Sequence, residues 1–317
     1  MKGYLGIDVG SVSTNIVFID EKKKLIEKIY IRTKGDPISS VKSALKQIQE
    51  KLAVELIIKG VGVSGSARSL IGAMVGADVI KNEITAHAVA AMTLEPEAKT
   101  IIEIGGQDSK IILIRDGVVI DFAMNNVCAA GTGSFLDQQA SRLGIPIEEF
   151  GAKALESKTD VSIAGRCTVF AESDMIHKQQ LGYSIEDIIN GLCYALVRNY
   201  FNTVAKGKDI QDLVLFQGGV AANIGIRRAF NNYLGTKVKI PEHFSVMGAY
   251  GAAVVALETM KKEKAATRFK GFALSEQDYK TTSFECADCP NTCEVVEFFE
   301  EGRVIARFGD RCKKHSV

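Results

Sequence analysis

A structural pattern that occurs twice constrains the fold of this chain more than any other feature. In the first copy, the apolar run Tyr4–Asp8 predicts a strand that ends in an acid, and the small residues Val9–Ser13 predict a tight turn. Strand-forming residues resume over Asn15–Ile19 and over Leu25–Arg32, which completes a three-stranded antiparallel meander. The backbone amides of such a turn can approach a phosphate closely, because glycine has no side chain.

The second copy begins at Thr100. Strands are predicted over Ile101–Ile104, Lys110–Ile114 and Val118–Met124, and Gly105–Ser109 forms the tight polar turn between the first two. Two such units that face one another can hold the β- and γ-phosphates of a nucleotide between their turns. The acids of this pattern that are expected near a magnesium ion and its waters are Asp8, Glu103 and Asp108.

Two further glycine-rich stretches follow the second copy. After a predicted strand over Asp212–Phe216, the paired glycines of Gln217–Asn223 let a flat ring approach the backbone, which suits adenosine. Lys237–Ile240 is predicted to be an edge strand. Gly248–Ala253 opens the last core helix, where small residues permit close packing against another helix at a hinge.

The seven cysteines need an explanation other than disulfides, because an odd number in a reducing cytosol disfavours structural pairing. Cys193 lies on the apolar face of a predicted helix and is assigned to the core. Cys128 and Cys167 each come just ahead of an apolar helical run. The partial positive charge of a helix start stabilises a thiolate, so both are candidate metal ligands. The alternative is that they are two buried thiols at ordinary helix starts.

Bulk composition excludes several classes of protein. The 317 residues carry 39 Lys and Arg against 38 Asp and Glu, and a net charge of +1 gives no basis for binding nucleic acid or a membrane surface. No apolar run is long enough to span a membrane, and Met1–Gly3 leads directly into a strand, so neither a span nor a signal peptide is predicted. The protein is expected in the cytoplasm, and its length suits a two-lobed core with an appendage.

With these motifs in place, the sequence resembles the ATPase activators of 2-hydroxyacyl-CoA dehydratases and the related ATPase subunits of benzoyl-CoA reductase, within the acetate and sugar kinase, Hsp70 and actin superfamily. The resemblance covers roughly residues 3 to 260 and is specific, because the motifs occur in order and include both cysteines. The matching segments are Leu5–Ser11, Glu103–Lys110, Asn126–Leu136, Ala164–Met175 and Phe216–Asn223.

The resemblance implies an α/β fold with two actin-like lobes, built from duplicated ribonuclease H-like domains. Residues 1–98 together with 246–262 would form lobe I, and residues 99–245 would form lobe II, which carries the cluster cysteines. Residues 263–317 would form a linker and a small cysteine-containing C-terminal appendage.

The resemblance also implies a homodimer in which Cys128 and Cys167 of each chain hold one [4Fe-4S] cluster between the subunits. Coordination chemistry agrees, because such a cluster is usually held by four thiolates and each chain offers two. The implied function is an ATP-dependent activator of anaerobic metabolism. It would take a low-potential electron from ferredoxin or flavodoxin and deliver it, with ATP binding and hydrolysis, to an iron–sulfur 2-hydroxyacyl-CoA dehydratase or a related reductase.

This hypothesis assigns a role to each motif residue. Asp8 and Asp108 would organise Mg²⁺, and either Glu103 or Gln107 would orient the attacking water. Glu103 could equally be a structural cap at the end of its strand. The residues expected to contact ATP or ADP are Gly10, Ser11, Ser13, Gly105, Gly106, Lys110, Gln217, Gly218, Gly219 and Asn223.

Two other functions use the same fold. A small-molecule kinase, of the amino-sugar type, would phosphorylate a hydroxyl group but would leave Cys128 and Cys167 without a purpose. A non-enzymatic actin-like scaffold would bind ATP and would keep its full function in the variant Cys128→Ser.

The tail offers a second possible metal site. Cys286, Cys289 and Cys293 follow a C-x₂-C-x₃-C spacing, and Cys312 lies further along the chain. A zinc ion held by four cysteines is the commoner kind of site, and a second iron–sulfur cluster is the alternative. His315 could take the place of Cys312. The tail also resembles a segment that follows the activator module in longer activase-like proteins.

Overall fold

A computed structural model describes residues 1–52, 56–125, 129–165 and 167–315. The chain divides into two compact units. Unit 1 consists of Met1–Ala90 and Gly248–Val317, and unit 2 consists of Ala91–Met247. The tail after the last core helix therefore groups with unit 1.

Unit 1 is built on a five-stranded sheet with the order β3-β2-β1-β4-β5. The first three strands pair antiparallel as the predicted meander, and β4 adds to β1 in the parallel direction. The predicted first copy of the repeat is confirmed. The strands are β1 (Lys2–Val9), β2 (Ser13–Ile19), β3 (Leu25–Arg32), β4 (Ile57–Ser64) and β5 (Val79–Ile80).

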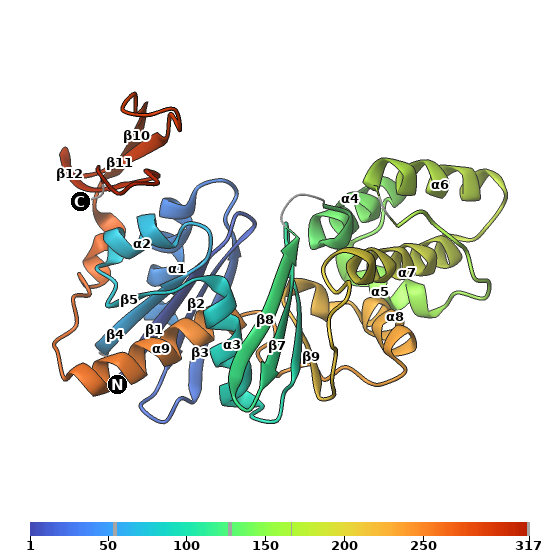
Figure 1. Cartoon of the computed structure of the whole chain (residues 1–317), viewed down its shortest axis with the longest axis horizontal. Helices are drawn as coiled ribbons and strands as arrows, with labels where there is room; N and C mark the ends of the chain where they lie inside the picture. Colours follow the sequence, from blue (N-terminus) through green and yellow to red (C-terminus); the bar gives the residue numbers. More distant parts are fainter. Residues whose placement is uncertain (53–55, 126–128, 166, 316–317) are drawn as a thin grey trace. The chain divides into compact units, whose positions relative to one another are not determined.

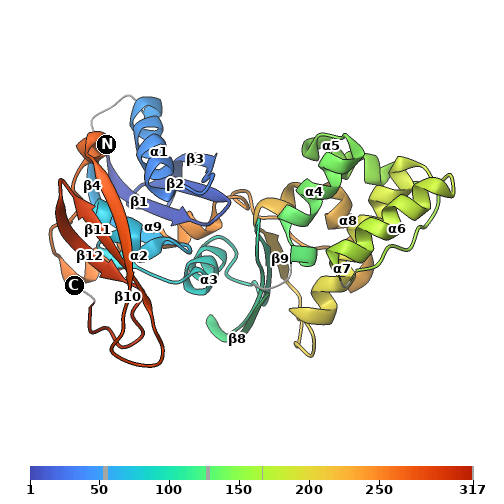
Figure 2. The same ribbon diagram turned by 90° about the horizontal axis from the view of Figure 1, so that it is seen from above.

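Helices cover both faces of this sheet (Figures 1 and 2). Side chains such as Leu5 and Ile7 point to the core under α1 (Pro37–Leu52) and α2 (Arg68–Val75). Alternate residues of a strand face opposite sides, so Gly6 faces α9 (Met247–Glu263).

The helix α9 lies directly on the sheet because the strand positions beneath it are glycines. A Cβ atom added to Gly6 would lie 1.9 Å from the carbonyl oxygen of Ala249, and one added to Gly62 would lie 2.0 Å from that of Ala252. The predicted contact with another helix is also present, since Gly251 touches the backbone of Ala86 in α3 (Glu83–Leu94). Small residues therefore let α9 pack closely on both sides.

Unit 2 repeats the arrangement on a four-stranded sheet with the order β8-β7-β6-β9. Its first three strands again pair antiparallel, and β9 adds to β6 in the parallel direction, as β4 adds to β1. The second copy of the repeat is confirmed. The strands are β6 (Thr100–Ile104), β7 (Ser109–Arg115), β8 (Val118–Asn125) and β9 (Val214–Gln217). The edge strand predicted over Lys237–Ile240 is reduced to a single bridge between Leu215 and Lys239.

Helices lie on one face of this second sheet and form a continuous apolar core with it (Figure 1). Cys193 of α7 is fully buried in this core, as predicted, and burial raises the pKa of its thiol to about 12. Among the described residues, no helix combines the length and the apolar composition needed to cross a membrane. The helical segments are η1 (Ala129–Gly131), α4 (Gly133–Leu143), α5 (Ile147–Leu155), α6 (Thr168–Gln180), α7 (Ile185–Thr203), η2 (Gly219–Ala222) and α8 (Ile224–Leu234).

The tail packs into unit 1 through a short helical turn and a three-stranded antiparallel sheet. Leu274, Phe298 and Ala306 belong to the same buried cluster as the residues under α1 and α2. The charged stretch before it, which was predicted to be a linker, is held by Asp78, whose carboxylate accepts hydrogen bonds from Thr267 and from the backbone of Arg268. The tail elements are η3 (Phe272–Glu276), β10 (Tyr279–Glu285), β11 (Glu294–Glu300) and β12 (Arg303–Phe308).

Asp187, in the first turn of α7, fastens the loop that leads towards α6. One oxygen of its buried carboxylate accepts hydrogen bonds from the amides of Lys158 and Thr159 at 2.8 and 2.9 Å and from the hydroxyl of Ser157 at 2.9 Å. A hydrogen bond with Ser184, followed by those with Thr159 and its neighbours, lowers the pKa of this carboxyl well below its usual range.

Asp187→Ala is expected to cost roughly 1–3 kcal/mol of unfolding free energy at neutral pH, because two backbone amides and a serine hydroxyl lose a charged acceptor. A lowered pKa stabilises the fold above the unfolded-state value, so the loss should shrink as pH falls below about 4. Urea unfolding at several pH values measures it. Glu186→Ala is the matched control, since Glu186 shares the first turn but not these bonds. An equal loss in both variants would assign the effect to the helix dipole instead.

Candidate functional site

The first predicted phosphate turn follows β1 in unit 1. Asp8 is the second-last residue of β1 and is half-buried, and the amide of Gly10 donates to the carbonyl of Ser13 at 2.9 Å to close the turn. The Asp8 carboxylate lies against the start of α9, because a Cβ atom on Gly248 would be 2.2 Å from Asp8 Oδ2. Ser11 is exposed at the tip of the turn.

Three buried hydroxyl side chains form a hydrogen-bond network behind this turn. None of them was predicted from the sequence. Thr14 Oγ1 lies 3.0 Å from Thr33 Oγ1 and 2.7 Å from Ser40 Oγ, and all three residues are buried. Thr33 Oγ1 also donates to the carbonyl of Gly10 at 2.9 Å. The hydroxyl network therefore fixes the turn to β3 and α1.

The second turn, in unit 2, repeats this geometry. The amide of Gly105 donates to the carbonyl of Asp108 at 3.0 Å, which is the counterpart of the bond from Gly10 to Ser13. Gln107 is exposed at the tip, and Asp108 is half-buried beside it. The two copies of the pattern thus agree at the level of single hydrogen bonds.

Lys110 brings the predicted acids of unit 2 together. Its ammonium lies 2.9 Å from Glu103 Oε2 and 2.7 Å from Asp108 Oδ1, and both Lys110 and Glu103 are buried. The hydroxyl of Tyr200 donates to the carbonyl of Lys110 at 2.9 Å. Burial, and then the charge of Glu103, raises the pKa of Tyr200 well above its ordinary value. Lys110 therefore neutralises two acids behind the turn.

The glycine-rich stretch after β9 has a structural reason as well. Gly218 adopts a φ of 89°, and a Cβ atom there would lie 2.3 Å from the carbonyl oxygen of Ile104 and 2.7 Å from Glu103 Oε1. Gln217 is buried opposite Glu103 in the strand register. Asn223 caps α8, because its Oδ1 accepts from the amide of Ile226 at 3.0 Å. Gly219 begins η2.

The turn of unit 2 is joined directly to the helix that follows the Cys128 stretch. The carbonyl of Gly105 accepts from the amide of Gly133 at 2.9 Å, and that of Gly106 accepts from Ser134 at 2.8 Å. Gly133 and Ser134 are the first residues of α4, whose amides have no partner within the helix. Two backbone hydrogen bonds therefore connect the turn to the start of α4.

Cys167 occupies the cap position immediately before α6, as predicted, in an extended conformation. Its side chain makes no capping hydrogen bond with the described first turn of α6, and it is half-buried. Cys128 lies outside the described residues. The structure thus places one of the two predicted thiols at a helix start.

The chain ahead of Cys167 is held by α6 and α7. The guanidinium of Arg198 donates to the carbonyl of Ile163, the amide of Ala164 donates to Asp174 Oδ2 at 2.7 Å, and Asn199 Nδ2 donates to the carbonyl of Gly165 at 2.5 Å. None of these three polar side chains was assigned a role from the sequence. For Asn199, the signal in the sequence was a polar residue on the apolar face of the α7 helix.

Asn199 also meets the segment that follows Cys128. A Cβ atom added to Gly131 in η1 would lie 2.9 Å from Asn199 Oδ1. The segment that follows Cys128 and the segment that precedes Cys167 therefore meet on one side chain of α7, although they are 34 residues apart (165 minus 131).

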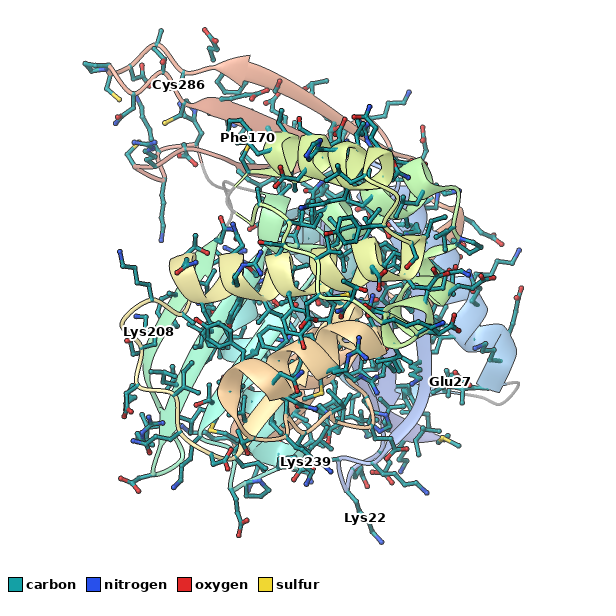
Figure 3. The ribbon with its side chains drawn as sticks, turned by 90° about the vertical axis from the view of Figure 1, so that its right-hand side faces the viewer. Lys22, Glu27, Phe170, Lys208, Lys239 and Cys286 are labelled. Atoms are coloured by element: carbon teal, nitrogen blue, oxygen red, sulfur yellow. The ribbon has the colours of Figure 1, made fainter. Side chains whose placement is uncertain are left out.

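The first turn of α6 exposes large apolar side chains next to Cys167. Val169 and Phe170 are 66% and 65% exposed, and Phe170 is labelled on α6 in Figure 3. Exposed apolar side chains of this size beside a candidate ligand are typical of a surface that another protein covers.

The four cysteines of the tail do not gather into one group. Cys286 is buried, Cys293 is half-buried, and Cys289 and Cys312 are exposed. Among the described residues, the group of possible metal ligands within 4.8 Å of one another consists of Cys286, Asp288 and His315. Asp288 was not among the residues predicted from the sequence.

Comparison with known proteins identifies the family. The model of the BadF/BadG/BcrA/BcrD ATPase family matches residues 5–256, which is most of the chain. The chain belongs to this family. As a member of the BadF/BadG/BcrA/BcrD ATPase family it is an ATPase, and the predicted resemblance and the actin-like α/β fold are both confirmed.

Two relatives of this ATPase family member and one solved structure are informative. The 2-hydroxyisocaproyl-CoA dehydratase activator of Clostridioides difficile is 33% identical over 82% of this chain and 97% of its own. The (R)-2-hydroxyglutaryl-CoA dehydratase activating ATPase of Acidaminococcus fermentans is 32% identical over 81% and 98%. A solved structure of the activator of the 2-hydroxyisocaproyl-CoA dehydratase from Clostridium difficile with bound ADPNP superposes with a TM-score of 0.77 over 83% of this chain and 97% of that one, at 32% identity.

Proposed function

We propose that this ATPase is an activator that uses ATP binding and hydrolysis to deliver a low-potential electron to an iron–sulfur 2-hydroxyacyl-CoA dehydratase or a related reductase. The observation that carries the proposal lies within unit 2. The turn Gly105–Gly106 binds the start of α4, and Asn199 of α7 meets both cysteine-bearing segments. Relatives that match nearly their whole length are dehydratase activators by name.

A [4Fe-4S] cluster fits the residues that are present. Cys167 lies before a helix start, where partial positive charge favours a thiolate, and its side chain is not used to cap the described turn of α6. Cys128 and Cys167 of two chains would supply the four thiolates that such a cluster usually takes. When bound, the cluster would supply one-electron redox chemistry at a low potential.

A second copy of the chain is the expected partner at this surface. Two cysteines make half a ligand set, and a two-fold axis completes it. Val169 and Phe170 beside Cys167 are exposed and apolar, which suits a buried contact. Ferredoxin or flavodoxin is the proposed donor of the electron.

The nucleotide is proposed to be bound by the two turns that the repeat produces. Asp8 near the end of β1 and Asp108 in the second turn are the proposed Mg²⁺ ligands, and the amides of both turns with Ser11 and Ser13 would hold the phosphates. Gln107, exposed at the tip of its turn, is better placed than the buried Glu103 to orient the attacking water. Lys110 would set the position of Asp108 through their ion pair.

A short series of contacts would then connect the nucleotide to the cysteines. The phosphates would rearrange Gly105–Gly106, this turn carries the start of α4, and the segment before α4 contains Cys128 and meets Asn199. ATP shifts the conformation only if it binds one arrangement of these contacts better than the other. This series of contacts therefore predicts that ATP and ADP produce different environments at the cysteines.

The test is anaerobic purification followed by iron and sulfide analysis and EPR spectroscopy of the reduced protein. We expect about four iron atoms per dimer. The EPR signal should change on addition of MgATP but not MgADP, and the signal should be lost when a 2-hydroxyacyl-CoA dehydratase is added with MgATP. An iron-free protein with full ATPase activity would contradict the proposal, and transfer of phosphate to an amino sugar would instead support the kinase function.

A further inference from the structure

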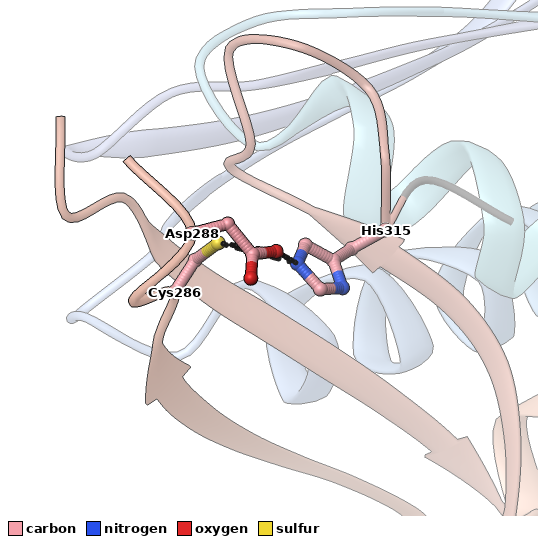
Figure 4. A group of neighbouring side chains, drawn as sticks. All are labelled: Cys286, Asp288 and His315. Atoms are coloured by element: carbon pink, nitrogen blue, oxygen red, sulfur yellow. Dashed lines mark hydrogen bonds and ion pairs between the residues drawn. The ribbon is translucent and has the colours of Figure 1, made fainter. Parts of the chain in front are cut away.

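The end of the tail brings three different metal-binding side chains together, as Figure 4 shows. Cys286 Sγ lies 3.3 Å from His315 Nε2 and 3.5 Å from Asp288 Oδ2, and His315 Nε2 lies 3.6 Å from the same oxygen. Cys286 follows β10 at the tip of the β10–β11 hairpin, whereas His315 comes from the segment after β12. The three donor atoms thus converge from two separate parts of the tail.

Contacts outside the group hold these side chains in place. The amide of Cys286 donates to the carbonyl of Cys293 at 2.8 Å across the hairpin loop, and the residue is 7% exposed. The amide of His315 donates to the buried Asp310 at 2.7 Å. The imidazole ring packs edge-on against Phe284, with ring centroids 5.5 Å apart. The arrangement does not depend on the three donors alone.

The distances between the donors match the edges of a tetrahedron around zinc. Zinc lies about 2.3 Å from sulfur and about 2.0–2.1 Å from nitrogen or oxygen, which places tetrahedral ligand atoms about 3.3–3.6 Å apart. The three observed separations span 3.3–3.6 Å. Hard cations such as Ca²⁺ and Mg²⁺ prefer oxygen ligands, so a thiol and an imidazole favour zinc.

We propose that the tail binds one zinc ion through Cys286 Sγ, Asp288 Oδ2 and His315 Nε2. The fourth position is left to water. The negative charges of a thiolate and a carboxylate balance the two positive charges of the zinc ion. Lys314 Nζ donates a hydrogen bond to Asp288 Oδ2 at 2.6 Å and orients the carboxylate. The ion would fasten the segment after β12 to the β10–β11 hairpin.

This ligand set differs from the four cysteines expected from spacing. Asp288 and His315 enter the set, while Cys293 contributes its backbone carbonyl to the hairpin. The two sets therefore make opposite predictions for variants of Asp288 and Cys293. Zinc binding in the tail is also independent of the function proposed for the core.

The test uses the full chain carrying Cys167→Ser, so that core iron does not interfere, with zinc counted by elemental analysis and Co²⁺ used as a spectroscopic substitute. We expect about one zinc per chain and the absorption of tetrahedral thiolate-bound Co²⁺. Cys286→Ser and His315→Ala should lose both. Asp288→Asn should weaken zinc binding at least about tenfold, because even residues that only hydrogen-bond to a metal ligand contribute about that much to metal affinity. Cys293→Ser should keep its zinc.

Circular dichroism and the ATPase rate, measured in the same variants made with Cys167 intact, check that His315→Ala is folded. Loss of zinc in Cys293→Ser with retention in Asp288→Asn would establish the four-cysteine site and overturn the proposal. Iron with sulfide in the tail, or no zinc at micromolar concentration, would overturn it as well. None of these outcomes changes the iron content expected of the core, so the two proposals fail separately.

Discussion

Cys167→Ser is expected to reduce the iron content of the anaerobically purified protein from about four atoms per dimer to near zero. A serine hydroxyl is not ionised at neutral pH and cannot replace a thiolate, and each substitution removes two of the four proposed ligands of a dimer. Electron delivery to a dehydratase should be lost entirely. ATP hydrolysis should persist, because the turns that are proposed to bind phosphate remain. Iron analysis and an ATPase assay on the same preparation measure both.

Cys193→Ala is the control for this experiment, since it removes a thiol from the same unit that is buried in the core. Cys193→Ala should keep the iron, and its free energy of unfolding should fall by roughly 1 kcal/mol because one buried sulfur atom is removed. If Cys167→Ser retains iron and activity, the thiol is an ordinary half-buried cysteine at a helix start. Equal iron loss in both variants would point to misfolding rather than to a lost ligand.

Lys110→Met is expected to cost roughly 3–5 kcal/mol of unfolding free energy in the absence of nucleotide. The substitution leaves the carboxylates of Glu103 and Asp108 facing each other without their shared cation, and Glu103 is 4% exposed. Removing one partner of a buried ion pair costs more than the pair contributes, because the remaining charge stays buried. Urea unfolding followed by circular dichroism measures the difference.

A matched control is Lys208→Met, since Lys208 forms an ion pair with Asp121 at 2.7 Å on the surface of the same unit (Figure 3). That loss should be much smaller than the loss in Lys110→Met, because water screens the exposed pair. Adding Glu103→Gln to Lys110→Met should restore part of the stability by removing the buried charge. If Lys110→Met is as stable as the wild type and only raises the KM for ATP, Lys110 is a phosphate ligand and not a structural cation.

The elements of the core could be predicted because their signals are local. The short apolar runs of β1, β2 and β3, with a small-residue turn after the first of them, return in β6, β7 and β8 and show the repeat without any knowledge of contacts. The prediction of a strand over Lys237–Ile240 was largely wrong, because only Lys239 forms a bridge. Composition shows that a segment is able to pair with a strand, but not how many of its residues do so. The strand β10 was not predicted, because its residues, apart from the buried Tyr279, are exposed and lack an apolar rhythm.

The candidate site was predicted residue by residue, but its contacts were not. Glycine-rich turns and the cysteine before α6 are visible in the sequence. The same sequence offered Lys110 as a phosphate ligand, whereas the structure shows it between two acids, one of them seven residues away on the neighbouring strand. Arg198 and Asn199 lie outside every matching segment, and Asp174 lies inside one but was given no role.

The sequence by itself determined the duplicated α/β architecture, the family and the residue types available for chemistry. The architecture and the residue types follow from spacing within single strands, turns and helices, where neighbours in sequence are neighbours in space. The family follows from the resemblance of the ordered motifs, which the family model confirms. The tertiary structure alone decided which side chains meet: Tyr200 with Lys110 across 90 residues, Gly165 with Asn199 across 34, and Cys286 with His315 across 29. Such pairs are fixed by how the elements pack, and no local pattern records them.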